Sequence, residues 1–104
     1  MNIHPKDQAI IHTLASLEEA GEKGFSNYYS GDIQTGSQEM QKSMKDSAQH
    51  IKMLQDPELK KQAKDLLEMT NRAIREYMKN PSEENLDTLK SDVDAYKGFL
   101  DEHQ

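Results

Sequence analysis

The chain has 104 residues, of which 34% are hydrophobic and 31% are charged, and its formal net charge is −6 at pH 7. This length supports one modest core, so we expect residues 1–104 to form a single domain. The negative charge disfavours binding to nucleic acids and anionic membranes, and the absence of cysteine excludes disulfides, thiolate metal sites and cysteine nucleophiles.

Three prolines mark the starts of predicted helices. Each follows a polar residue and precedes apolar residues at helical spacing, as in His4-Pro5, Asp56-Pro57 and Asn80-Pro81. Proline has no N–H to donate and its fixed φ suits the first turn of a helix, whereas the interior of a helix excludes it. The stretches between the prolines therefore predict long helices with short connections.

The first predicted helix covers residues 5–29. Its apolar face is expected to hold residues three and four apart: Ile10, Leu14, Leu17, Gly21, Phe25 and Tyr28. Gly31 is a typical C-terminal cap and Asp32 a good N-cap for the next helix. Gly21 and Gly24 lie inside the predicted helix at a cost of about 1 kcal/mol each, which predicts close approach of a neighbouring helix or a small cavity.

The second and third predicted helices cover residues 32–55 and 57–79. The second begins anywhere between Asp32 and Ser37, because Thr35, Gly36 and Ser37 are poor helix formers. Its expected core residues are Ile33, Met40, Met44, Ser47, Ile51 and Leu54. Those of the third are Leu59, Ala63, Leu66, Thr70, Ala73 and Tyr77, with Leu67, Ile74 and Met78 beside them.

The fourth predicted helix covers residues 81–102, with Asn80 as its N-cap and Glu83 three residues later. Its core residues repeat in heptads: Leu86, Leu89, Val93, Tyr96 and Leu100. Short connections make consecutive helices antiparallel, so the sequence predicts an all-α, up-down-up-down antiparallel four-helix bundle. An alternative arrangement uses the same faces between two chains, as hairpins that swap or stack in a dimer.

Antiparallel packing of these helices would bring histidines to one end of the bundle. His12, His50 and His103, with His4, are the candidate ligands there, beside several carboxylates. Imidazole and carboxylate groups bind Zn²⁺, Ni²⁺ or Cu²⁺. However, His-x₃-His and Glu-x-x-His pairs are absent, so we expect polar helix ends and no metal or other cofactor.

A group of carboxylates suggests a second possible site. Glu18, Glu19 and Glu22 would lie near Glu84 and Asp87 if the first and fourth predicted helices are antiparallel neighbours. The spacing resembles that of the Mg²⁺-binding carboxylates in all-α nucleotide pyrophosphohydrolases. The resemblance implies a Mg²⁺-dependent enzyme, but Leu17 and Gly21 are expected to take the inward positions and leave the acids flanking the core. We therefore interpret these acids as a solvated face.

The charged faces of the last two predicted helices are complementary. Antiparallel packing would place Arg72 near Asp87 and Lys64 near Asp94, in ion pairs worth about 0–1 kcal/mol each. If these pairs do not form, the basic face is free to bind a charged partner.

The leading functional hypothesis is a small, acidic, non-enzymatic protein of the bacterial accessory or regulatory kind. It would bind another protein or itself, including as a homodimer. Tyr29 and Met53 lie off the apolar faces and are the candidate partner-binding residues. The first residues lack an apolar signal core and no stretch is long and apolar enough to span a membrane, so the expected location is the cytoplasm. The alternative is a mature chain from which a signal peptide has been removed.

Overall fold

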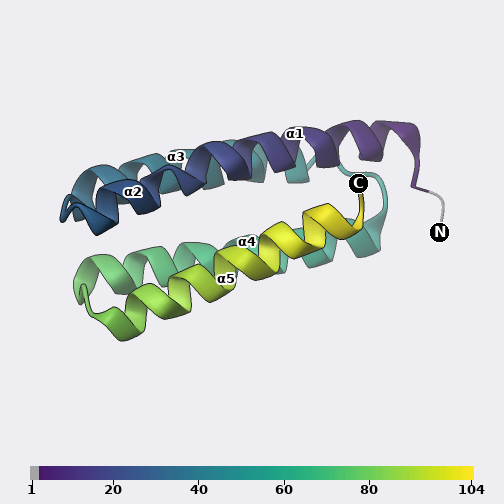
Figure 1. Ribbon diagram of the computed structural model, residues 1–104. Helices are drawn as coiled ribbons and strands as arrows, with labels where there is room; N and C mark the ends of the chain where they lie inside the picture. Colours follow the sequence, from purple (N-terminus) through teal and green to yellow (C-terminus); the bar gives the residue numbers. More distant parts are fainter. Residues whose placement is uncertain (1–2) are drawn as a thin grey trace.

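A computed structural model of the protein describes residues 3–104, and within that range all regular structure is helical. Five helices follow one another: α1 Pro5–Glu22, α2 Gly24–Tyr29, α3 Ile33–Ile51, α4 Pro57–Lys79 and α5 Glu83–Glu102. The short α2 continues the line of α1, so the two form one rod of a four-helix bundle (Figure 1). The predicted all-α four-helix bundle is confirmed.

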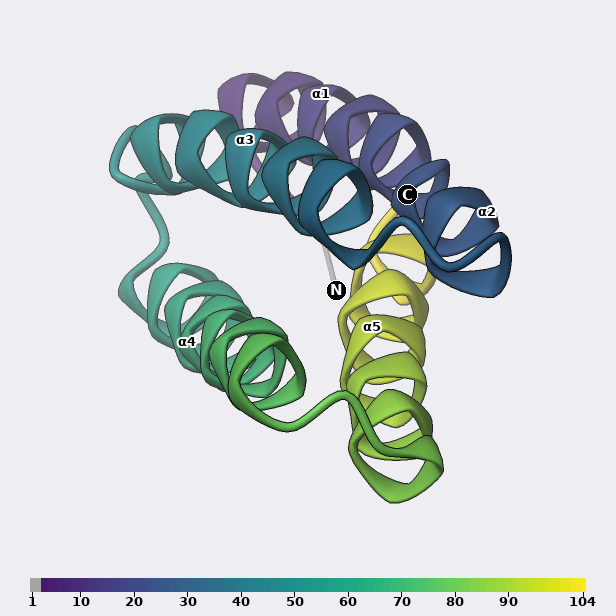
Figure 2. The ribbon, with the colours of Figure 1, turned by 90° about the vertical axis from the view of Figure 1, so that its left-hand side faces the viewer.

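The helices form an elongated bundle with extents of 42 × 19 × 19 Å. Figure 1 shows α1, α2 and α3 on one side of the bundle and α4 and α5 on the other. Viewed from one end, the four rods surround a shared interior (Figure 2). Helix α3 packs against α1 and α4, and α5 packs against α4 and α1. Each rod therefore contacts the rod that follows it in the chain.

The interior is filled mainly by the predicted apolar residues of α3, α4 and α5. On α1 the prediction was wrong at two positions, because Ile10 and Leu17 are only partly buried. The buried positions of α1 are Asp7, Ile11, Leu14, Glu18 and Gly21. Leu14 and Gly21 are buried as predicted, whereas Ile11 and Glu18 take the places expected for Ile10 and Leu17. Together with Asp7, this arrangement brings two carboxyl groups into the core.

The single helix predicted for residues 5–29 is interrupted at Lys23. The interruption lies between two glycines, Gly21 and Gly24, that closely approach α3. A Cβ added to Gly24 would lie 2.6 Å from the carbonyl oxygen of Gly36, and one added to Gly21 would lie 2.6 Å from Ser43 Oγ. The helices therefore approach through small residues, which confirms the close-packing interpretation of Gly21 and Gly24 and accounts for the break.

Three helix boundaries differ from or refine the prediction. Helix α3 begins at Ile33, where the Asp32 side chain accepts a hydrogen bond from the Thr35 amide, and it ends at Ile51 instead of residue 55. Ser82 caps α5 in place of Asn80, because its hydroxyl accepts a hydrogen bond from the Asn85 amide. The predicted range of α4 is confirmed.

A carboxylate from α1 holds the connection between α3 and α4. Asp7 is 1% exposed, and its two oxygens accept hydrogen bonds from the backbone amides of Gln55 at 2.8 Å and Asp56 at 3.0 Å. Asp56 in turn caps α4 by accepting from the amides of Glu58 and Leu59. This Asp7 clamp holds the connection that precedes α4 against the first turn of α1.

None of the helices formed by residues 3–104 combines the length and apolar character needed to cross a lipid bilayer.

Candidate partner-binding groove

The surface between α3 and α4 contains an apolar groove of about 260 Å³. Its apolar floor is made by Ala48 and Ile51 of α3 and Leu67 of α4. Ile51 and Leu67 are buried members of the core, and Ala48 packs against the core from its edge. The groove is therefore an outward extension of the hydrophobic interior.

The rim of this groove is basic. Its polar lining residues are Lys52, Lys60, Lys64, Glu68 and Asn71. The three lysines and one glutamate give the rim a formal charge of +2, although the whole chain carries −6. An apolar floor with cationic edges suits an amphipathic ligand that carries negative charges beside its apolar groups.

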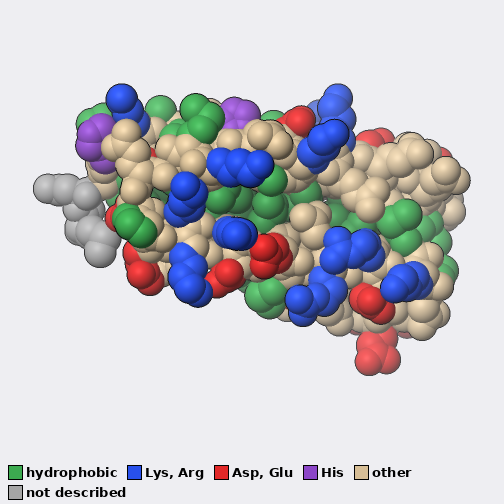
Figure 3. Space-filling view, turned by 180° about the vertical axis from the view of Figure 1, so that it is seen from behind, with side chains coloured by type: hydrophobic (Ala, Val, Ile, Leu, Met, Phe, Trp, Pro, Cys, Tyr) green, Lys and Arg blue, Asp and Glu red, His purple; other side chains and the backbone are tan. Residues whose placement is uncertain are grey.

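The basic rim belongs to a wider separation of charge. Residues 33–79 contain nine lysines and arginines against seven acidic residues, whereas the rest of the chain contains four against twelve. Figure 3 shows the side of the molecule formed by α3 and α4, where basic side chains gather around hydrophobic ones. The negative charge of the protein is therefore concentrated on α1 and α5, and the α3–α4 surface is attractive to anionic groups.

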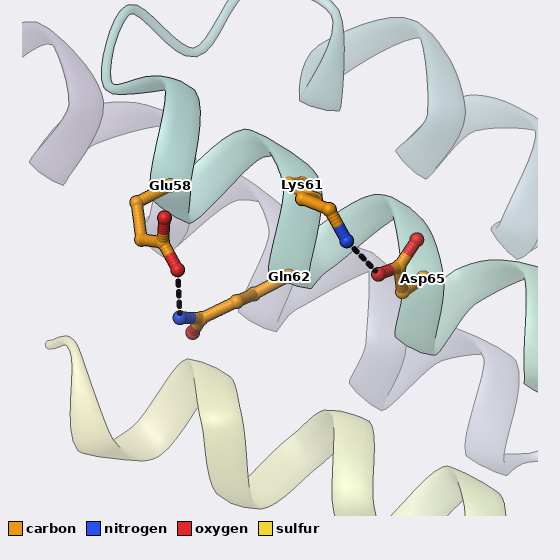
Figure 4. Close-up of polar contacts among 4 residues, drawn as sticks. All are labelled: Glu58, Lys61, Gln62 and Asp65. Atoms are coloured by element: carbon orange, nitrogen blue, oxygen red, sulfur yellow. Dashed lines mark hydrogen bonds and ion pairs between the residues drawn. The ribbon is translucent and has the colours of Figure 1, made fainter.

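Two pairs of side chains interact on the outer surface of α4 next to the groove (Figure 4). Lys61 forms an ion pair with Asp65 at 3.0 Å, and Gln62 donates a hydrogen bond to Glu58 at 3.2 Å. Throughout residues 3–104, the only other ion pair within 4.0 Å joins Lys97 to Glu22 at 3.7 Å. The groove lysines Lys60 and Lys64 consequently keep their charge available.

The expected ion pairs between α4 and α5 do not form. Lys64 lies on the α3 side of α4, in the groove, and not near Asp94. Arg72 lies near Asp92 instead of Asp87, and burial raises the pKa of the Asp92 carboxyl while Arg72 lowers it. The pairing that the sequence suggested for these two helices was therefore wrong. The alternative, a basic face free to bind a charged partner, included Lys64, but Lys52 and Lys60 were missed. The sequence signal for this site was the four-residue spacing of Lys60 and Lys64, which places both lysines on the same face of the helix as the apolar Leu67.

Two of the candidate metal ligands, His50 and His103, are engaged by their own helices. The ring Nδ1 of His50 donates to the Asp46 carbonyl at 2.9 Å, and that of His103 donates to the Phe99 carbonyl at 2.7 Å. His12 is exposed on α1, and the His4 ring accepts from the Lys6 amide. Among the described residues, no group of three or more histidine or acidic side chains has a metal-binding arrangement.

The acidic residues are not arranged as the pyrophosphohydrolase resemblance implies. Glu18 and Glu19 line a cavity with Lys97 and Asp101, near the C-terminus of α5, whereas Glu84 lies on a separate surface near the N-terminus of α5. Glu18 was expected to flank the core but is 3% exposed. Burial raises its pKa to about 8, and the neighbouring Glu22 carboxylate acts in the same direction.

The predicted partner-binding residues Tyr29 and Met53 are both exposed, at 60% and 62%. The Lys90 ammonium lies 4.7 Å from the centroid of the Tyr29 ring, so this tyrosine already has a cationic neighbour from α5. Met53 directly follows the groove residue Lys52. Their exposure agrees with the prediction, and Met53 lies at the end of α3 where the groove begins.

Comparison with known proteins gave no match to a family model, to a curated protein or to a solved structure.

Proposed function

We propose that the protein is a non-enzymatic interaction module that binds an acidic amphipathic helix of a partner protein in the α3–α4 groove. The observation that carries this proposal is the apolar floor of Ile51 and Leu67 beneath a rim of three lysines. An amphipathic helix buries a row of apolar side chains and can flank that row with glutamates or aspartates. We place this interaction in the cytoplasm, as the sequence predicts.

The size of the groove favours side chains over a whole small molecule. Its volume of about 260 Å³ lies below the roughly 300–1,000 Å³ typical of small-molecule sites. A few leucine-sized side chains from one face of a helix fill such a space. Charged rims of this kind mainly accelerate association and select the partner, so we expect modest affinity and strong dependence on salt.

A second copy of the chain is a poorer occupant. The acidic residues of the protein are concentrated on α1 and α5. Within the described residues, however, the large exposed apolar side chains are Tyr29, Met53, Met69 and Met78. Tyr29 stacks with Lys90, and the three methionines lie on or next to α3 and α4. The acidic side therefore lacks the apolar row that would fill the groove of another molecule.

A pair of synthetic peptides tests this proposal. The first is a fluorescent amphipathic helix of about 15 residues, with leucines three and four apart and glutamates on both sides of them. The second has lysines in place of the glutamates. Fluorescence anisotropy should detect binding of the glutamate peptide alone, and that binding should weaken as salt is added.

Charge reversal locates the binding surface. Lys60→Glu combined with Lys64→Glu should weaken binding of the glutamate peptide at least ~tenfold. Lys61→Glu is the matched control, because Lys61 lies on the same helix but outside the groove lining. Equal loss in the control, equal binding of both peptides, or no binding would contradict the proposal. Dimerisation that depends on Lys60 and Lys64, without peptide binding, would show that the occupant is a second copy.

A further inference from the structure

A second cavity, of about 330 Å³, lies between α1 and the C-terminal half of α5. Its carboxylates are Glu18 and Glu19 from α1 and Asp101 from α5, and Lys97 is also in its wall. Ala15 and the buried Leu100 are its apolar lining residues. The cavity is separate from the α3–α4 groove, and its volume lies within the range of small-molecule sites.

The innermost polar group of this cavity lacks a partner. Glu18 is 3% exposed, and its Oε2 atom is buried without a hydrogen-bond partner. A buried polar atom of this kind costs about 1–3 kcal/mol relative to a satisfied one, and more when it is charged. Because Glu18 lines the cavity, a ligand that donates hydrogen bonds to Oε2 would remove that cost.

The charged residues that line the cavity indicate the charge of the ligand. With Glu18 ionised, three carboxylates face one ammonium group, that of Lys97, which gives a net charge of −2. Lys97 is already paired with Glu22. A linear dication with a short methylene chain complements two charges separated by apolar wall, whereas a metal ion does not, since the described side chains offer it no cluster of three ligands.

We propose that this cavity binds a short linear alkyl diamine as its dication. One ammonium group donates to the Glu18 carboxylate, the methylene chain packs against Ala15 and Leu100, and the other ammonium group contacts the exposed carboxylates of Glu19 and Asp101. This proposal is independent of the peptide groove.

Binding of the diamine is coupled to the release of a proton from Glu18. The ammonium group requires the ionised form of Glu18, whose pKa burial raises to about 8. The proton that Glu18 releases on binding passes to the buffer, so diamine affinity should rise between about pH 6 and pH 8. The groups that bear on Glu18 are Glu22 on its own helix, the Tyr96 hydroxyl, the Lys97 ammonium and the Asp101 carboxylate, with His12 in the cavity wall.

Isothermal titration calorimetry with diaminobutane tests the proposal. Titrations at pH 7 in two buffers of different ionisation enthalpy should reveal release of about one proton per bound diamine. Butylamine, which has one ammonium group, should bind at least ~tenfold more weakly. Sodium chloride of matched ionic strength serves as the reference for nonspecific screening.

Three variants connect the binding to the cavity. Glu18→Gln should weaken diaminobutane binding at least ~tenfold and abolish proton release, and Ala15→Met should block the cavity without changing any charge. Glu102→Gln is the matched control, because Glu102 is exposed next to Asp101 but outside the lining. Wild-type binding in Glu18→Gln or Ala15→Met, equal affinity for butylamine, or no measurable heat of binding would overturn the proposal.

Discussion

Glu18→Gln should change how the stability of the protein depends on pH. In the folded protein the pKa of the Glu18 carboxyl is about 8, so the group keeps its proton up to that pH. In the unfolded chain its pKa returns to the ordinary value of 4.5. Between these two values the folded state holds one more proton than the unfolded state. Raising the pH therefore favours unfolding, and this contribution to stability, full below pH 4.5, is lost as pH rises through 8.

The size of the effect follows from the interval between the two pKa values. Each pH unit within it lowers the free energy of unfolding by about 1.4 kcal/mol, which totals about 3–5 kcal/mol between pH 4.5 and pH 8. Glutamine has the shape of the protonated carboxyl and no proton to lose. The Gln variant should match the wild type near pH 4.5 and exceed its stability by about 3–5 kcal/mol at pH 8.

Urea denaturation followed by circular dichroism, at a series of pH values from 4.5 to 8.5, measures this difference. Glu19→Gln is the matched control, because Glu19 is the adjacent residue but is exposed, and its curve should stay parallel to that of the wild type. If the curves of Glu18→Gln and the wild type are parallel across the series, Glu18 is not a buried, protonated carboxyl and the reasoning fails.

Four further substitutions test the packing, each by its shift in urea midpoint. Asp7→Ala removes the acceptor of two backbone amides and should cost about 2–4 kcal/mol, and an unchanged midpoint would contradict the Asp7 clamp. Gly24→Ala should cost more than about 2 kcal/mol because its Cβ meets the Gly36 carbonyl, whereas Gly98→Ala, with open space around it, should stabilise α5 by about 0.5–1 kcal/mol. Leu89→Ala empties a fully buried site and should cost about 2–5 kcal/mol, and a near-neutral result would show that α5 is packed differently.

The elements with strong local signals could be predicted from the sequence. Helix α4 has the predicted bounds because Asp56 and Pro57 begin it and Asn80 and Pro81 follow it, all within a few residues of the chain. The turn before α3 was also predictable, since Gly31 adopts φ +91° and Asp32 caps the helix. Such signals depend on one or two neighbouring residues, so they survive without knowledge of the tertiary packing.

The features that depend on contacts between helices could not be predicted. Hydrophobic periodicity assigned Leu17 to the core of α1 and left Glu18 outside, because a pattern of apolar residues cannot identify a buried carboxyl. The break at Lys23 arises from the approach of α3. The registers of α5 against α1 and α4 were also misjudged, which is why the expected ion pairs and the acidic site did not form.

The Asp7 clamp has a consequence for the dynamics of the bundle. The amides of Gln55 and Asp56 lie in the connection between the two halves, yet their acceptor belongs to the first turn of α1. Hydrogen exchange at these amides therefore requires that α1 detach from the connection, so their protection reports on the opening of a distant segment. The Asp7 carboxylate therefore couples two events that are 48 residues apart in the sequence: the fraying of α1 and the opening of the α3–α4 connection. The two occur together as one cooperative event.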